Sequence, residues 1–256
     1  PNAAGDVEID PTRDTRIGSL DKFRRAYGVI PHPDGSVWIS RRFPVPGQLI
    51  RLELGDNPPE TCKSEVYEPP YNPTGNPDDW GYGPRGIDVD TNGLVWTALG
   101  GSGHFASFDR TQCAVLNGPQ ATGQHCAAGW RLYQTPGPRM KGVDGTANAD
   151  YHYYSWVDQF DALGLGANVP IATGTSSDAL LALLPETGEW VTMRVPYPLG
   201  FYSRGLDGRI DDAAAGWKGR GVWASFNTGS TFHLEGGKGT TSEIVQFQIR
   251  PHPLAE

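Results

Sequence analysis

The chain has 256 residues, including 34 glycines and 22 prolines, and its formal net charge is −8. So many turn-forming residues argue against long helices, and the negative charge argues against nonspecific binding to nucleic acid, which needs a basic surplus. No stretch approaches the ~20 consecutive apolar residues that cross a bilayer. Composition therefore favours a protein of many short strands, with no nucleic-acid partner and no membrane span.

A hairpin pattern occurs twice in the first half of the chain. Residues 28–40 and 86–98 align without a gap. Each contains a turn pair, Asp-Gly at Gly35 or Asn-Gly at Gly93, and each pair is followed by an apolar strand. Such pairs tolerate the positive φ of tight hairpins. The sequence thus predicts two copies of one hairpin.

A second pair of strands follows each hairpin. The clearest example is residues 177–196, in which two alternating strands flank the turn Pro-Glu-Thr-Gly. Segments 48–54 with 65–70, and 105–109 with 129–136, have the same pattern. Each repeating unit is therefore expected to hold four antiparallel strands, although the third unit lacks the Gly-x-Val-Trp signature.

Four-stranded units that repeat every ~40 to 60 residues are typical of β-propellers. Trp38, Trp96 and Trp223 recur at one position of the unit, which the alternative, a β-sandwich, does not require. We predict an all-β fold, a β-propeller with about four blades of four antiparallel strands. The expected segments are blades at about 24–70, 83–138, 150–199 and 200–250, preceded by the end of another blade or a linker at 1–23 and followed by a C-terminal tail at 251–256.

The pattern Pro-x-Gly-Ile-x-Val-Asp-x-x-Gly-x-Val-Trp at residues 84–96, together with the Leu-Pro-Glu-Thr-Gly-Glu that precedes Trp190, resembles the repeat of the streptogramin lyases (virginiamycin B lyases). More distantly it is similar to NHL and gluconolactonase-type propellers. The resemblance covers about two thirds of the chain. Such propellers usually have six or seven blades, so the resemblance implies a partner, which is additional polypeptide of the same gene or another subunit that completes the ring.

Three cysteines bear on the cellular location. Cys113 and Cys126 flank a segment rich in Gly, Pro and Asn that is typical of a hairpin tip. A disulfide between them would hold this loop, and the alternative is two free buried thiols. Cys62 has no assigned partner. A disulfide agrees with a periplasmic or secreted location.

The repeat places several polar side chains at one end of the expected channel. In a propeller, the loops that enter the innermost strands lie at the same end as the loops that join the second and third strands. Arginines in this set suit a carboxylate or phosphate, although ion pairs between blades, with Asp88 or Asp207, are an alternative for them. The five side chains expected around this channel mouth are Arg85, His104, Arg204, His233 and Glu235.

His233 and Glu235 are the candidates for catalysis. Alternate residues of an extended segment point to one side, so the two could share a divalent cation such as Mg²⁺ or Ca²⁺, or form an acid/base pair. The alternative is a solvated histidine near a surface carboxylate. Streptogramin lyases open a lactone by elimination with a divalent metal and a His/Glu set, and the resemblance therefore implies His233 and Glu235 as catalytic and metal-binding residues.

Two functions remain open at this point. The first is an extracytoplasmic propeller that binds a small ligand or a partner at the channel mouth. The alternative is a metal-dependent lyase, or a lactonase-type hydrolase, acting on an ester, lactone or sugar acid. The sequence contains no Ser-centred nucleophile elbow, phosphate-cradling loop or dinucleotide fingerprint. The enzyme hypothesis needs a metal or a His/Glu pair, whereas the binding hypothesis predicts a face rich in Arg and aromatic residues.

Overall fold

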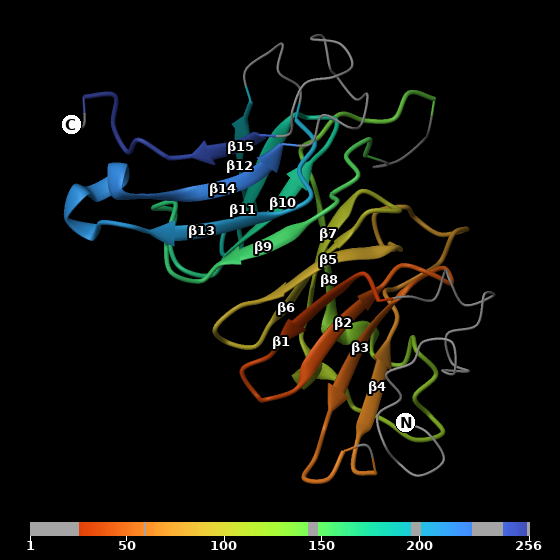
Figure 1. Ribbon diagram of the computed structural model, residues 1–256. Helices are drawn as coiled ribbons and strands as arrows, with labels where there is room; N and C mark the ends of the chain where they lie inside the picture. The colour runs from red at the N-terminus through yellow and green to blue at the C-terminus, as the bar shows by residue number, and fades with distance from the viewer. Residues whose placement is uncertain (1–25, 59, 143–147, 196–200, 227–242, 255–256) are drawn as a thin grey trace.

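The computed structural model of the chain describes residues 26–58, 60–142, 148–195, 201–226 and 243–254. Its strands form four antiparallel sheets that follow one another along an arc (Figure 1). Within the described residues, no helix is long and apolar enough to cross a membrane. The propeller fold predicted from the repeat is confirmed.

Each sheet is one blade, and its strands pair in chain order. Three blades have four strands, and the fourth has three within the described residues. Blades 1 and 2 contain β1 (Gly28–Pro31), β2 (Val37–Arg41), β3 (Gln48–Glu53) and β4 (Lys63–Tyr67), then β5 (Pro84–Val89), β6 (Val95–Leu99), β7 (His104–Phe108) and β8 (Trp130–Gln134). Blades 3 and 4 contain β9 (Ser155–Asp158), β10 (Val169–Gly174), β11 (Ala179–Leu184) and β12 (Glu189–Arg194), then β13 (Leu206–Ile210), β14 (Arg220–Phe226) and β15 (Glu243–Phe247). Short 3₁₀ helices lie at Arg110–Gln112, Ala127–Gly129 and Ala213–Gly219.

The first strand of every blade lies at the inside of the arc. β5 contacts both β1 and β9, and β9 also contacts β13. In Figure 1 these four strands lie one after another, and their first residues are toward the right-hand side. They therefore form the wall of the central channel, and all four enter it from the same end.

The register shows why tryptophan recurs in the sequence. Trp38 of β2 lies opposite Ile30 of β1. Trp96 pairs in the same way with Asp88, and Trp223 pairs with Asp207. The tryptophans therefore occupy one position next to the innermost strand, which makes the sequence repeat a structural repeat.

The hydrophobic core is divided among the contacts between blades. Three separate clusters fill the interfaces between blades 1 and 2, 2 and 3, and 3 and 4. Each sheet therefore depends on its neighbours for burial, as in other propellers. The largest buried side chains of the three interfaces are Trp38, Tyr67 and Phe108, then Trp96 and Phe105, then Ile171 and Phe201.

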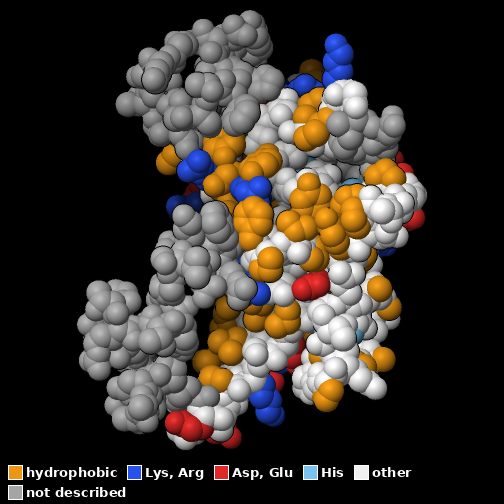
Figure 2. All heavy atoms as spheres, turned by 90° about the vertical axis from the view of Figure 1, so that its right-hand side faces the viewer, with side chains coloured by type: hydrophobic (Ala, Val, Ile, Leu, Met, Phe, Trp, Pro, Cys, Tyr) orange, Lys and Arg blue, Asp and Glu red, His pale blue; other side chains and the backbone are white. Residues whose placement is uncertain are grey.

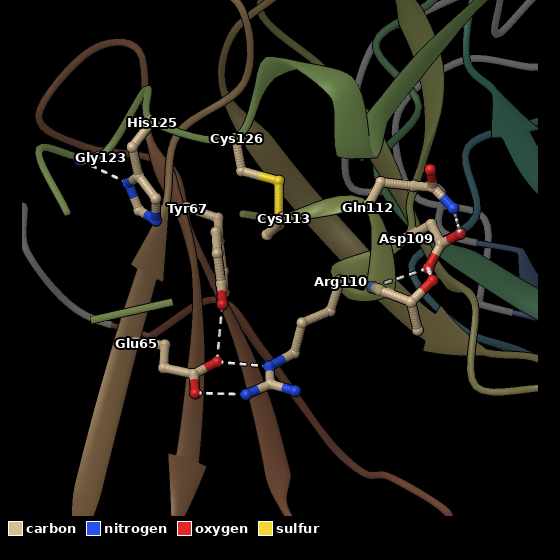
Figure 3. Close-up of a disulfide and its surroundings, with 10 residues drawn as sticks. Glu65, Tyr67, Asp109, Arg110, Gln112, Cys113, Gly123, His125 and Cys126 are labelled. Carbon is tan, nitrogen blue, oxygen red and sulfur yellow. Dashed lines mark hydrogen bonds and ion pairs between the residues drawn. A yellow bond between two sulfur atoms is a disulfide. The ribbon is translucent and has the colours of Figure 1, made fainter. Parts of the chain in front are cut away.

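The predicted disulfide between Cys113 and Cys126 is present (Figure 3). It closes the long loop between β7 and β8, and Cys126 packs into the core between blades 1 and 2. Cys62 is half-buried and is not bonded to a described cysteine. The disulfide therefore holds the long β7–β8 loop of blade 2 against blade 1.

Candidate functional site

The end at which the innermost strands begin is called the channel mouth here. Tyr27 immediately precedes β1, Arg85 lies at the start of β5, Tyr153 lies just before β9, and Arg204 lies just before β13. Each of the four blades thus contributes one of these four residues. Figure 2 looks onto this end of the molecule. It shows Lys and Arg side chains interspersed with side chains of the hydrophobic colour class, to which Tyr belongs.

Arg85 is the central residue of the mouth. The pairing of β5 with β6 shifts register between Pro84 and Ile87, so Arg85 lies in a β-bulge, a feature that re-aims side chains. Arg85 is only 2% exposed. Its guanidinium carbon lies 3.8 Å from the ring centroid of Tyr151 and 4.7 Å from that of Tyr153. The buried cation is therefore surrounded by aromatic faces, which attract it electrostatically.

Arg204 approaches the same aromatic residues from blade 4. Its guanidinium carbon lies 4.9 Å from the ring centroid of Tyr153 and 5.3 Å from that of Tyr202. Unlike Arg85, Arg204 is exposed. Two arginines of different blades thus meet on one ring, one shielded and one open to solvent. The arginine–tyrosine cluster is defined as Tyr27, Arg85, Tyr151, Tyr153, Tyr202 and Arg204.

The positive charge of the cluster acts on its own hydroxyls. A hydrogen bond from Tyr27, followed by the charges of Arg204 and Arg85, lowers the pKa of Tyr153. Burial, together with the hydrogen bond to Tyr153, raises the pKa of Tyr27. Nη1 of Arg85 donates a hydrogen bond of 3.3 Å to the Tyr27 hydroxyl. The mouth therefore favours negative charge near Tyr153.

Neither arginine of the cluster forms an ion pair with a carboxylate of the described residues. From the sequence, Asp88 was an alternative ion-pair partner for these arginines. It accepts hydrogen bonds instead from the backbone N–H of Val157 at 2.7 Å and of Val89 at 2.9 Å. Asp207 accepts one from Gly208 at 2.9 Å. The interblade ion pairs considered from the sequence are therefore not formed here, and the arginines face tyrosines.

The glycine-rich loop between β6 and β7 also reaches the mouth. A Cβ placed on Gly100 would lie 2.6 Å from Cδ of Arg85 and 2.6 Å from the carbonyl oxygen of Tyr151, so only glycine fits there. His104, which follows this loop, is 3% exposed. Neither of its ring nitrogens has a hydrogen-bond partner in the described part of the chain, and burial lowers its pKa. The loop supports Arg85, and His104 is a neutral, enclosed side chain.

His152 holds the tyrosines of blade 3 in place. It is fully buried with a positive φ of 40°. Its Nε2 lies 2.8 Å from Oγ1 of Thr135, and its Nδ1 lies 3.2 Å from the carbonyl oxygen of Thr173. The left-handed residue His152 lies between Tyr151 and Tyr153, whose ring centroids are 6.2 Å apart. Sequence reasoning did not identify these tyrosines as site residues, although the run Tyr-His-Tyr-Tyr was the available signal.

The predicted catalytic pair His233 and Glu235 lies outside the described residues. Among the residues that are described, no group of three or more His, Cys, Asp or Glu side chains could hold a metal ion. The divalent cation implied by the resemblance therefore finds no ligand set in the described ranges, and its assignment to His233 and Glu235 stays a prediction.

No family model matches the chain, and no curated protein matches it. Among solved structures, a streptogramin B lyase matches with a TM-score of 0.51 at 14% identity, covering 90% of this chain and 56% of that one. PorZ, a surface component of the type-IX secretion system of Porphyromonas gingivalis, matches with a TM-score of 0.50 at 11% identity, covering 78% of this chain and 24% of PorZ. Virginiamycin B lyase from Staphylococcus aureus is 17% identical, with a TM-score of 0.49, and the match covers 90% of this chain and 57% of the lyase.

At such low identities the likeness concerns the fold alone. The chain spans a little more than half the length of the two lyases. The resemblance seen in the sequence repeat is thus confirmed at the level of architecture, and this protein has the β-propeller fold of the streptogramin B lyases.

Proposed function

We propose that this protein is an extracytoplasmic β-propeller that binds a small organic anion at its channel mouth. The observation that carries the proposal is Arg85, a buried cation that lies among tyrosine rings and has no carboxylate partner in the described chain. A buried charge normally has an opposite charge close by. A carboxylate or phosphate of a ligand would supply it.

The cluster has the chemistry that such a ligand requires. A guanidinium that lies over a ring can still bind a carboxylate or phosphate through the N–H donors that remain after the bond from Nη1 of Arg85 to Tyr27. Arg204 is exposed and can meet the ligand first, while the burial of Arg85 strengthens its interaction with an anion because the surroundings are less polarisable. The tyrosine rings provide apolar area for an aromatic or aliphatic ligand body.

The proposed location rests on the disulfide. A bond between Cys113 and Cys126 persists in the periplasm or outside the cell, where thiols are not kept reduced. The alternative function, a metal-dependent lyase or lactonase-type hydrolase, depends on His233 and Glu235, and no geometry of the described residues favours it over binding.

Calorimetric titration of the protein with benzoate and with phenyl phosphate tests the proposal. Benzamide serves as the neutral comparison ligand. Arg204→Ala should weaken anion binding about 10- to 100-fold, because it removes a charge-assisted hydrogen-bond donor. The control is Arg209→Ala, which removes an exposed cation of the same blade that is paired with Asp211. If both variants lose the same anion affinity, the loss comes from the change in net charge and not from the channel mouth, and the proposal is contradicted.

We also propose that further polypeptide covers the open face of blade 1. Val29, Ile39, Ile50 and Val66 lie opposite one another in a row across all four strands. Their neighbours in sequence, such as Trp38, pack toward blade 2, so the row points the other way. Val29 is 59% exposed. This aliphatic row has the composition of an interface between blades.

A further inference from the structure

A cavity of about 250 Å³ lies on the channel wall, beyond the mouth. All four innermost strands contribute to it, since Ile30 of β1, Ile87 of β5, Val157 of β9 and Gly208 of β13 line it. Its volume is below the usual range for drug-sized ligands. The cavity therefore suits a small molecule, and its other lining residues decide which kind.

The charge of the cavity is negative. Asp88 and Asp207 line it from β5 and β13, and no Lys, Arg or His belongs to its described lining. Backbone N–H groups hold both carboxylates in position, through one bond to each oxygen of Asp88 and one bond to Asp207. A carboxylate oxygen can accept more than one hydrogen bond, so both groups retain capacity to bind a donor from a ligand.

The charge of Asp207 acts on Asp88, and both carboxylates act on a shared neighbour. Burial, followed by the charge of Asp207, raises the pKa of Asp88 to about 6. Burial and then the charges of Asp88 and Asp207 raise the pKa of Tyr154. Tyr154 is therefore within the field of both carboxylates, and a cation placed there would relieve the repulsion between them.

Aromatic side chains form the remaining wall. Tyr154, Trp156 and Phe160 line the cavity, and Phe160 is 73% exposed, while Tyr154 is 36% exposed. Aromatic faces attract cations, and organic ammonium groups are often held in this way. Ser155, also in the lining, is 1% exposed, and its Oγ has no hydrogen-bond partner in the described chain. This oxygen is enclosed beside the backbone of Gly86.

We infer that this cavity binds a small organic amine as its ammonium cation, with Asp88 and Asp207 as counter-charges and the aromatic residues as its apolar wall. A metal ion fits less well, because the described residues bring together only two carboxylates and no set of three potential ligands. A primary ammonium has three donors, which is enough to bind both carboxylates. The inference does not depend on the anion site at the mouth.

The Arg-Gly-Ile-Asp and Arg-Gly-Leu-Asp segments explain how both sites arise. Residues 85–88 and 204–207 each begin with an arginine at the mouth and end with an aspartate in the cavity. The repeat therefore separates the two charges along the channel. The titratable groups around Asp88 are Asp207 of β13 and Tyr154 beside β9.

The experiment uses benzylammonium as the probe and benzyl alcohol as the neutral isostere, with calorimetry or ligand-detected NMR as the measurement. At about pH 8 the ammonium should bind at least tenfold more tightly than the alcohol, and at about pH 5, where the amine is still protonated but Asp88 is largely neutral, its affinity should fall about tenfold. Asp207→Asn, at an exposed position, should produce a loss of similar size. Asp211→Asn, an equal change of net charge in the same blade, should leave the affinity unchanged.

Several results would overturn the inference. The first two are that benzyl alcohol binds as tightly as benzylammonium, or that the wild-type chain does not bind benzylammonium. The third is that the Asp207→Asn and Asp211→Asn variants bind benzylammonium with equal affinity. The fourth is that Ca²⁺ displaces the amine at lower concentrations than a second amine does. Asp88→Asn is a second test, but it removes an acceptor of a backbone hydrogen bond, so its thermal unfolding must be measured beside its affinity. Loss of amine binding with an unchanged unfolding temperature supports the inference.

Discussion

The guanidinium groups of Arg85 and Arg204, which come from blades 2 and 4, lie over the same tyrosine ring, 4.7 and 4.9 Å from the centroid of Tyr153. Without that ring, the two cations would lose the one aromatic face that they share, although Arg85 would keep Tyr151 and Arg204 would keep Tyr202. Each cation–π contact is worth about 0.5–1 kcal/mol at an exposed site and more when it is desolvated.

Tyr153→Leu should therefore weaken the binding of benzoate by roughly tenfold, since it removes both contacts. Tyr153→Phe is the matched control, because it keeps the ring and loses only the hydroxyl, and it should bind nearly as well as the wild type. Calorimetric titration of the two variants measures the difference. If leucine and phenylalanine variants bind benzoate equally, the ring does not position the arginines.

The disulfide should contribute measurably to stability. Closing a loop of this length restricts the unfolded chain by about 3 kcal/mol, so the Cys113→Ser/Cys126→Ser double variant should unfold at a clearly lower denaturant concentration. Cys62→Ser, at a half-buried cysteine outside the bond, is the control and should change little. Peptide masses before and after reduction check the bond directly. Two alkylated thiols at positions 113 and 126 in native protein would remove the basis for an extracytoplasmic location.

A buried ion pair joins blades 1 and 2 beside the disulfide. Glu65 of β4 accepts two hydrogen bonds of 2.6 Å from Arg110, and a third of 2.6 Å from the Tyr67 hydroxyl (Figure 3). Burial alone would raise the pKa of Glu65, but the bonds from Arg110 and Tyr67 outweigh it and lower the pKa. The carboxylate is therefore stabilised in its charged form in the folded protein.

Arg110→Met should destabilise the fold by about 2 kcal/mol near neutral pH. This is less than for a fully enclosed pair, because Arg110 is partly exposed and Nη1 of Arg51 stays 3.5 Å from Glu65. Since the pKa of Glu65 is lowered on folding, its contribution is present above the unfolded pKa of about 4.3 and is lost as pH falls through the folded value. The gap between wild type and variant should therefore shrink in acid. Denaturant unfolding at several pH values measures it, with the exposed Lys63→Met as control. A gap that is constant down to strong acid would mean that Arg110 acts only through packing.

Local turn chemistry made the fold predictable, whereas the site depended on contacts between blades. The turn pairs at Gly35 and Gly93 and the recurring tryptophans specify hairpins within a blade, which need no knowledge of the rest of the chain. The repeat could also assign Arg85 and Arg204 to one end of the channel. It could not reveal Tyr153, because the third unit lacks the signature of the others and β9 begins only at Ser155.

The β-bulge and the burial of His104 were equally hidden from the sequence. The register shift at Arg85 follows from how β5 pairs with β6. Apart from the glycine at position 86, no residue of this segment predicts a bulge. His104 was expected at the mouth because of its loop. Its burial comes in part from residues outside that loop, such as Gly81, where an added Cβ would lie 3.7 Å from Nδ1 of His104.

The last prediction concerns the open face of blade 1. The row of Val29, Ile39, Ile50 and Val66 would be covered in a complete ring. Without a covering blade Val29 is exposed and the other three are only half-buried, so the row leaves apolar surface in contact with water. The 27.7 kDa chain alone should therefore self-associate as its concentration rises, and it should bind a dye that fluoresces in apolar surroundings.

Introducing an opposite-charge pair across the strands, Ile39→Lys with Ile50→Glu, should reduce this association, because the two residues are direct partners in the register and their charges can pair. Thr192→Lys, on the exposed outermost strand of blade 3, is the control and should leave the association unchanged. Sedimentation velocity over a range of concentrations measures the outcome. A wild-type chain that stays monomeric at all concentrations and unfolds in one cooperative transition would show that this face needs no covering polypeptide.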